Sequence, residues 1–147
     1  MDEGKLLGHI ISKDGIRIDP ARVEAIQLID LPWNKKEIQA FNGKMNFLRR
    51  FIPNLAEHLR EMTNMLKKDS IVKWSEEAIK SFNLVKFALS NAPILISPDY
   101  TQEFIIFSFA FEHTMAVVLI QKRDEVENPI AFFSRTIRDV ALRYNII

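Results

Sequence analysis

Three residues of one predicted helix could together contact a strand of nucleic acid. Gln39, Gly43 and Phe47, here called the glycine row, recur every four residues and place an amide, a bare backbone and an aromatic ring along one line. Glycine in a helix interior costs about 0.5–1 kcal/mol relative to alanine, and close approach of another backbone or of a ligand is the usual reason for it. The spacing leaves two interpretations open: tight packing against a neighbouring helix, or a surface laid against sugar and phosphate.

Positive charge gathers around the glycine row. Residues 35–73 contain nine Lys or Arg against four Asp or Glu, whereas residues 1–34 and 74–147 each have a net charge of −2. A local excess of basic side chains favours binding to a phosphate backbone, although the whole chain is nearly neutral at +1. The basic residues expected to contact nucleic acid with the row are Lys36, Lys44, Arg49 and Arg50.

Other site chemistries find little support in the sequence. The histidines at positions 9, 58 and 113 fall on three different predicted elements, without paired ligands at metal-binding spacing. The chain has no Gly-rich phosphate loop, no Gly-X-Ser-X-Gly motif and no cysteine, which excludes disulfides and cysteine-based metal sites. The carboxylate-rich run 124–128 is interpreted as a solvated turn between strands.

The sequence around the glycine row predicts the helix that carries it. Asn34 followed by Glu37 forms a capping-box pattern at its start, and Pro53 is expected to stop it. An apolar stripe at spacings of three and four should face a core. The stripe consists of Ile38, Phe41, Met45, Leu48 and Ile52.

Periodicity and turn signals predict the other elements. A hairpin turns at Asp14-Gly15, a short helix starts at Asp19-Pro20, and a third long helix starts at Ser75. The predicted segments are strands 6–11 and 16–18, helices 20–30, 55–66 and 76–90, strands 94–96, 104–109, 115–121 and 129–134, and a helix 135–144.

Composition bounds the class of protein. With 147 residues and 48% apolar content, the chain can bury a real core. It shows no cleavable signal and no apolar run approaching ~18 residues, so we expect an intracellular protein with no membrane partner.

Many short stretches together resemble one family, the polymerase region of gypsy-type long-terminal-repeat retrotransposons. Each stretch is weak alone, but they follow the family's order along nearly all of the chain. They are Leu7-Gly8-His9-Ile10-Ile11-Ser12, Gly15-Ile16, Asp19-Pro20, Leu31-Pro32, Lys36-Glu37-Ile38, Phe41, Gly43, Asn46-Phe47, Arg49-Arg50-Phe51-Ile52, Leu66-Lys67-Lys68, Trp74, Ala92-Pro93-Ile94-Leu95 and Pro98-Asp99-Tyr100.

The resemblance implies two parts of a polymerase in the first two-thirds of the chain. Leu7, Gly8 and His9, here called the grip turn, resemble the primer grip, and residues 35–68 resemble the thumb. In the more distant retroviral enzymes, the positions that match the glycine row form a track along the minor groove of the template–primer duplex. The position that matches Phe47 is Trp in those enzymes. Phe47 therefore keeps an aromatic face but lacks the hydrogen-bond donor of the indole ring.

The remainder resembles a connection and the start of a ribonuclease H domain. That domain cuts the RNA of a hybrid by a two-metal mechanism, in which a carboxylate on the first strand bridges the cations. The family pattern is Thr-Asp-Ala-Ser at positions 108–111, so Phe109 stands where the resemblance implies a metal-binding aspartate. Glu112 would lie on the other face of the strand, about 10 Å along it, and a nuclease that uses this displaced ligand is kept as an alternative.

The resemblance places the remaining catalytic carboxylates outside the chain. Those of the polymerase motif Tyr-X-Asp-Asp would precede Met1, and the second ribonuclease H carboxylate would follow Ile147. The chain alone is therefore expected to be no enzyme and to need no cofactor, while a complete parent enzyme would use Mg²⁺.

The sequence predicts an α+β fold in two units. Residues 1–92 are expected to form an N-terminal β-hairpin with a thumb-like unit of three to four helices. Residues 93–147 are expected to form a connection and an incomplete antiparallel ribonuclease H-like sheet with a C-terminal helix.

The function expected from the resemblance is that of a polyprotein fragment, in the cytoplasm or in a virus-like particle. It would bind RNA–DNA hybrid or DNA duplex independently of sequence through the glycine row and its basic neighbours. The alternative outside nucleic-acid binding is a retained protein-interaction module that forms a homodimer through an exposed apolar sheet.

Overall fold

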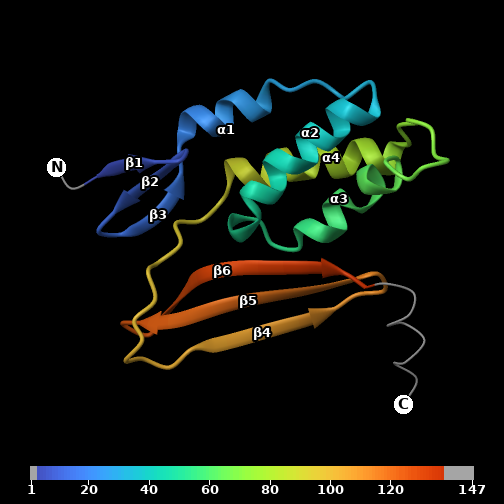
Figure 1. The fold of residues 1–147 in the computed structure, drawn as a ribbon. Helices are drawn as coiled ribbons and strands as arrows, with labels where there is room; N and C mark the ends of the chain where they lie inside the picture. Colours follow the sequence, from blue (N-terminus) through green and yellow to red (C-terminus); the bar gives the residue numbers. More distant parts are fainter. Residues whose placement is uncertain (1–2, 138–147) are drawn as a thin grey trace, which may run out of the picture.

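The computed structural model describes residues 3–137, and these form an α+β fold (Figure 1). Within them lie four α-helices, one 3₁₀ helix and two antiparallel three-stranded sheets. The α+β prediction is confirmed. The elements are β1 (Gly4–Leu6), β2 (His9–Ser12), β3 (Gly15–Ile18), α1 (Pro20–Gln27), α2 (Lys35–Phe47), η1 (Arg49–Phe51), α3 (Leu55–Asn64), α4 (Glu76–Ser90), β4 (Ile105–Ala110), β5 (Thr114–Arg123) and β6 (Val126–Thr136).

The N-terminal sheet has three strands where the sequence predicted a two-stranded hairpin. β1 pairs with β2, and β2 pairs with β3. The single strand expected over 6–11 is wrong because Leu7 and Gly8 both adopt positive φ, at 51° and 80°, and reverse the chain between β1 and β2. Glycine tolerates this left-handed conformation and leucine rarely adopts it. The apolar run 6–11 therefore gave no signal of a turn at Leu7.

Three helices, α1, α2 and α4, begin where their capping residues predict. Asp19, Asn34 and Ser75 each accept a hydrogen bond from a backbone N–H of the first turn of α1, α2 and α4, respectively. Glu37 completes the start of α2 by accepting a hydrogen bond from Trp33 N at 2.8 Å. α2 ends at Phe47, well before Pro53, because the chain tightens into η1.

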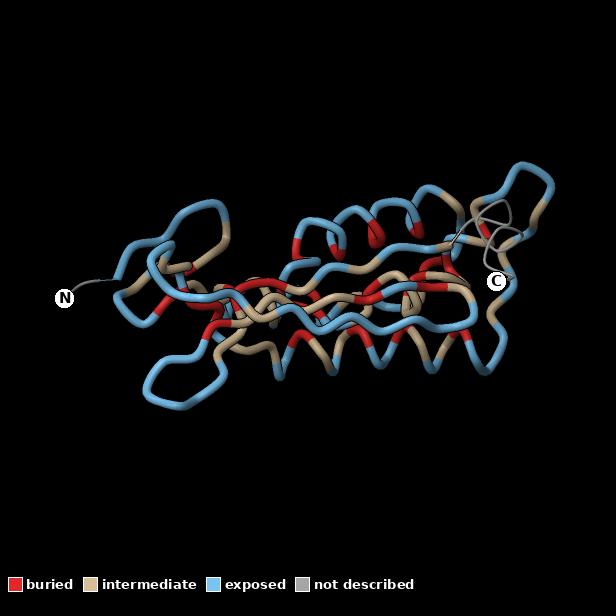
Figure 2. The backbone as a smooth tube through the Cα atoms, turned by 90° about the horizontal axis from the view of Figure 1, so that it is seen from below, coloured by how far each residue is buried: buried red, intermediate tan, exposed pale blue. Residues whose placement is uncertain are grey.

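The apolar stripe of α2 faces the main core, as predicted. All five of its residues are at most 2% exposed and pack with apolar residues of α3, α4 and the N-terminal sheet. In Figure 2 the buried residues lie mainly on the sides of the helices that face the middle of the molecule. The opposite side of α2 therefore faces outward.

The C-terminal sheet has the order β4-β5-β6, with β6 nearest the helices (Figure 1). The predicted strands 104–109, 115–121 and 129–134 are present, and β5 and β6 are longer than predicted. The turn between them is confined to Asp124 and Glu125, so residues 126–128 belong to β6. The predicted helix 135–144 is wrong at its start, because Arg135 and Thr136 continue β6 and Ile137 follows it outside any helix, whereas residues 138–144 lie outside the described residues.

The predicted units 1–92 and 93–147 contact each other along β3 and β6. The segment 94–96 forms only an isolated bridge, in which Ile16 N donates to Leu95 O at 2.7 Å and Leu95 N donates to Ile16 O at 2.8 Å. Phe132 of β6 packs against the main core. A boundary near residue 92 remains a prediction. Across residues 3–137, no helix has the length and apolar character needed to cross a membrane.

Candidate nucleic-acid interface

The glycine row lies on the open face of α2. Gln39 and Gly43 are exposed, and Phe47 keeps 47% of its surface exposed. Among the described residues, a Cβ atom built on Gly43 would meet no heavy atom within 4 Å outside the local helix. Packing against a neighbouring helix is therefore not the reason for this glycine, and the backbone of α2 is open to an approaching molecule.

The four predicted basic residues are all exposed, but they do not share one face. Lys36 precedes Gly43 by seven residues, two helical turns, and so lies on the same face of α2. Lys44 is turned by about 100° from Gly43. Arg49 and Arg50 belong to η1, which continues from the end of α2.

The grip turn reaches the glycine row through His9. Its imidazole stacks on the Phe47 ring with centroids 5.5 Å apart, and on the Phe51 ring at 5.4 Å. Leu7, the residue at the tip of the turn, is exposed. Two segments that were predicted separately, 7–9 and 39–47, thus form one continuous surface.

Arg22 joins the same surface and was missed by the sequence analysis. Its Nη1 donates a hydrogen bond to Leu7 O at 3.0 Å, and its guanidinium carbon lies 4.6 Å from the Phe47 ring centroid. A guanidinium over an aromatic ring is a favourable cation–π contact. The signal available in the sequence was a basic residue in the first turn of the helix that follows the grip turn.

The electrostatics of this surface are positive around His9. Partial burial lowers the pKa of His9, and the nearby charges of Arg22 and Arg50 lower it further, while a backbone interaction with Leu6 opposes them. His9 Nε2 is buried without a hydrogen-bond partner among the described residues. Two guanidinium groups therefore flank an aromatic stack and give this surface its positive charge.

The position that resembles a nuclease metal site is apolar. Phe109 lines a hollow with Asn54, Phe111, Ala116 and Phe132, so the residues around this position offer no carboxylate to a cation. Glu112 is largely exposed and lies 3.6 Å from His113. Across residues 3–137, no cluster of three or more His, Cys, Asp or Glu residues could hold a metal ion.

Sequence comparisons place the chain among reverse transcriptase regions. Residues 74–147 match the family model described as an RNase H-like domain found in reverse transcriptase. The retrovirus-related Pol polyprotein from transposon 297 of Drosophila melanogaster is 37% identical over 146 residues, which cover 99% of this chain and 13% of the relative. The corresponding polyprotein from Drosophila transposon 412 is 33% identical over 92% of this chain and 11% of its own length.

More distant similarity extends to yeast and to solved structures. The transposon Tf2-3 polyprotein of Schizosaccharomyces pombe is 27% identical over 97% of this chain and 11% of its own length. The foamy viral protease-reverse transcriptase, solved in complexes with double-stranded DNA and with RNA/DNA hybrid, matches with a TM-score of 0.81 at 24% identity. These matches cover 96% of this chain and 25% and 19% of the solved chains. The chain spans only 11–13% of the length of these curated transposon relatives.

Proposed function

Because the chain belongs to the family of RNase H-like domains found in reverse transcriptases, in the form carried by retrotransposon Pol polyproteins, we propose that it binds a template–primer duplex through α2. The bound species is an RNA–DNA hybrid or a DNA duplex, and binding is independent of sequence. The location that goes with this function is the cytoplasm or a virus-like particle. The observation that carries the proposal is the open backbone at Gly43 in the middle of an exposed helix face.

The dimensions of the glycine row suit a short stretch of duplex. Eight residues of α-helix separate Gln39 from Phe47, a rise of about 12 Å. Successive nucleotides of one strand are about 3.4 Å apart, so the row spans about three to four of them. Gly43 lets sugar and phosphate approach the helix, while Gln39 offers an amide on one side and the half-exposed Phe47 ring lies on the other.

The grip turn extends this surface beyond α2. Arg22 holds Leu7 O and covers Phe47, and His9 stacks on the same ring, so the turn and the row are fixed to each other. The resemblance implies that the turn holds the primer end. In the proposed complex the turn would contact one strand while α2 lies along the groove.

Charge supplies most of the proposed affinity. Lys36, Lys44, Arg49 and Arg50 are exposed around the row, and binding through phosphates carries no sequence information. Non-specific binding to duplex typically has a dissociation constant of about 10⁻⁴–10⁻⁶ M at physiological salt. We expect an affinity in that range, which rises as salt is lowered.

The proposal assigns no catalysis to this chain. Phe109 replaces the metal-binding aspartate that the resemblance implies, and its apolar surroundings do not fit the Mg²⁺ of a complete enzyme. The displaced-ligand alternative depends on Glu112 in this chain. Cleavage of an RNA–DNA hybrid with Mg²⁺ that is lost in Glu112→Gln would support that alternative, whereas cleavage that survives Glu112→Gln would exclude Glu112 as the ligand.

A comparison of three variants tests the binding proposal. Gly43→Gln fills the open backbone with a long side chain and should weaken binding to a labelled hybrid, measured by fluorescence anisotropy at about 50 mM salt. Asn83→Gln adds the same side chain to the exposed surface of α4 and should leave affinity unchanged. If Gly43→Gln binds the hybrid normally while Arg50→Ala binds it weakly, the surface acts through charge alone. The proposed contact between the glycine row and the groove of the duplex would then be contradicted.

The protein-interaction module remains a second candidate because of the β4 edge. Within residues 3–137, β4 pairs with β5 and with no other strand, and it exposes apolar side chains, among them Ile106 at 64% and Phe109 at 53%. An exposed apolar edge strand can pair with a second copy of itself. A stable dimer in gel filtration without hybrid binding at about 50 mM salt would favour this candidate over the duplex-binding proposal.

A further inference from the structure

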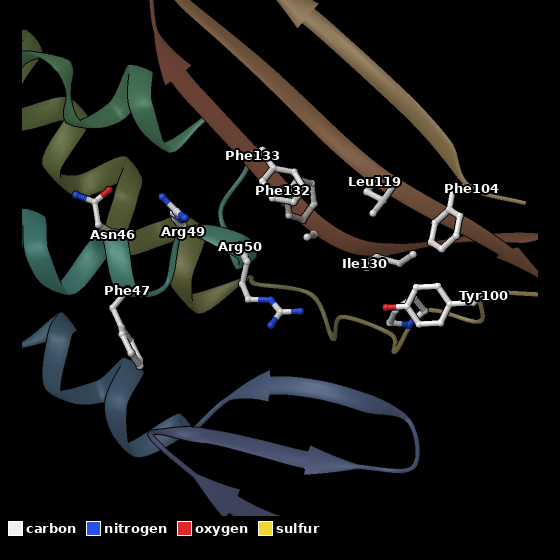
Figure 3. Close-up of a pocket in the computed structure, with 12 residues that line it drawn as sticks. Asn46, Phe47, Arg49, Arg50, Tyr100, Phe104, Leu119, Ile130, Phe132 and Phe133 are labelled. Atoms are coloured by element: carbon white, nitrogen blue, oxygen red, sulfur yellow. The ribbon is translucent and has the colours of Figure 1, made fainter.

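A hollow of about 580 Å³ opens where the glycine row ends. Phe47, the last residue of the row, lines one side, and the C-terminal sheet lines the other (Figure 3). Leu119 and Ile130 give the hollow an apolar wall, and Tyr100 lies opposite Arg50. Its volume lies in the range of sites for small molecules, and it is continuous with the proposed duplex surface.

Tyr100 is presented to solvent by a fixed loop. Its side chain is 84% exposed, and its ring lies 6.1 Å from that of Phe104. Gln121, only 1% exposed, accepts a hydrogen bond from Asp99 N at 2.8 Å and donates one to Asp99 O at 2.7 Å. Asp99 in turn accepts two hydrogen bonds from Thr101, so the loop holds its aromatic residue outward without burying it.

Arg50 gives the hollow its charge. Its guanidinium points into the hollow on the side that faces Tyr100, whereas Arg49 points away from Tyr100 (Figure 3). Neither arginine has an ion-pair partner among residues 3–137. A cation beside an exposed aromatic ring and an apolar wall is the combination that binds a single nucleic-acid strand, with phosphate on the cation and a base stacked on the ring.

We propose that this hollow binds one unpaired nucleotide of a strand that leaves the duplex at the end of the glycine row. Arg50 takes its phosphate, and its base stacks on Tyr100 against the apolar wall. An interior base of a duplex is already stacked on both faces and cannot stack on Tyr100, whereas an unpaired base beyond the duplex end has a face free for the ring. The proposal rests on the proposed function, because the shared residue Phe47 places the hollow beside the duplex surface.

The experiment compares a blunt hybrid with the same hybrid carrying a four-nucleotide single-stranded overhang. Stacking of one base on an aromatic ring is worth about 1–3 kcal/mol, so we expect the overhang to improve affinity about tenfold in anisotropy titrations at about 50 mM salt. Tyr100→Ala should remove this gain and leave affinity for the blunt hybrid unchanged. Tyr100→Phe keeps the ring and should retain the gain.

Three further variants separate the contribution of the hollow from that of general charge and aromaticity. Arg49→Ala should weaken binding of both hybrids by the same factor and preserve the gain, whereas Arg50→Ala should reduce the gain itself. Phe87→Ala removes another exposed aromatic residue, on α4, and should change neither affinity. Equal affinity for the two hybrids, or a gain that survives Tyr100→Ala, would contradict the proposal that the hollow binds an unpaired nucleotide. Neither result would contradict the proposal that α2 binds a duplex. Binding to neither hybrid would overturn both.

Discussion

Ser134 Oγ accepts a hydrogen bond from Ala56 N at 2.9 Å and so caps a helix that lies 78 residues earlier in the chain. Asn54 precedes α3 in a left-handed conformation, with φ of 49°, and its side chain makes no capping hydrogen bond. Thr114 Oγ1 strengthens the same junction by donating to Glu57 Oε2 at 3.1 Å. The C-terminal sheet therefore supplies the cap that the sequence next to α3 lacks.

Removing this cap should destabilise the protein without altering α2. We predict that Ser134→Ala lowers the free energy of unfolding by about 0.5–2 kcal/mol, the usual cost of losing a helix N-cap. Urea unfolding followed by circular dichroism measures the change. Ser108→Ala, at an exposed position of β4 in the same sheet, is the matched control and should shift the midpoint little. Equal effects of the two substitutions would mean that the hydrogen bond adds no stability.

Gly43→Ala should separate stability from binding. The new methyl group would enter open space, and alanine is favoured over glycine in a helix interior by about 0.5–1 kcal/mol. We predict a more stable protein in urea unfolding that binds hybrid more weakly. Ala40→Gly, the reverse exchange at another exposed position of α2, should lose a similar amount of stability. A destabilised Gly43→Ala would show that the backbone there needs glycine for folding.

Gly8→Ala should detach Arg22 from the grip turn. Gly8 has φ of +80°, and an added Cβ would overlap Arg22 Nη1. The Arg22 side chain can move away, but it then loses its hydrogen bond to Leu7 O and its contact with the Phe47 ring. In addition, a non-glycine residue in this backbone conformation costs about 1–3 kcal/mol. We predict a loss of that size in urea unfolding, together with weaker hybrid binding.

Two controls check the cause of that loss. Gly4→Ala, at a site with nothing within 4 Å of the added atom, should be close to neutral. Gly8→Ala should also cost less in an Arg22→Ala background, because the contacts of the arginine are already gone. An equal cost in both backgrounds would assign the whole effect to backbone strain.

Acid should destabilise the fold through two histidines. Burial is the main cause that lowers the pKa of both His9 and His58 below 6.5. From about pH 6.5 down to these lowered values the unfolded chain binds more protons than the folded one, so stability is complete above pH 6.5 and falls as pH drops. We predict a lower free energy of unfolding at pH 5.5 than at pH 7.5. A flatter profile for His58→Gln would assign part of the loss to that residue, and an unchanged profile for both His58→Gln and His9→Gln would contradict the assignment.

Local signals were enough to predict most of the architecture. Asp19, Asn34 and Ser75 cap helices as predicted because a capping side chain and its N–H partners lie within three residues of each other. The strands from residue 105 onward were found because their apolar runs are bounded by polar turns. The α2 stripe was found because a periodic face must be buried somewhere.

Features that depend on distant contacts could not be read from the sequence. Leu7 adopts a left-handed turn inside an apolar run, and η1 replaces the last predicted turn of α2, although the residues there fit the helical period. Arg22 joins the candidate site only because the fold brings α1 beside Phe47. In the sequence, Tyr100 is one of many residues that carry the family resemblance. Only the fold shows that it lies opposite Arg50.

Salt dependence gives the most direct test of how many basic residues meet phosphates. If Lys36, Lys44, Arg49 and Arg50 each neutralise one phosphate of a B-form DNA duplex, log K should fall with log salt at a slope of about −3.6, which is four times −0.9. Arg50→Ala should make the slope less negative by about 0.9, because one fewer counterion is released. Lys80→Ala removes a lysine from a separate hollow on α4 and should leave the slope unchanged. A slope near zero would mean that α2 binds no phosphates, and a slope that Arg50→Ala and Lys80→Ala change equally would show that binding reflects overall charge and not this surface.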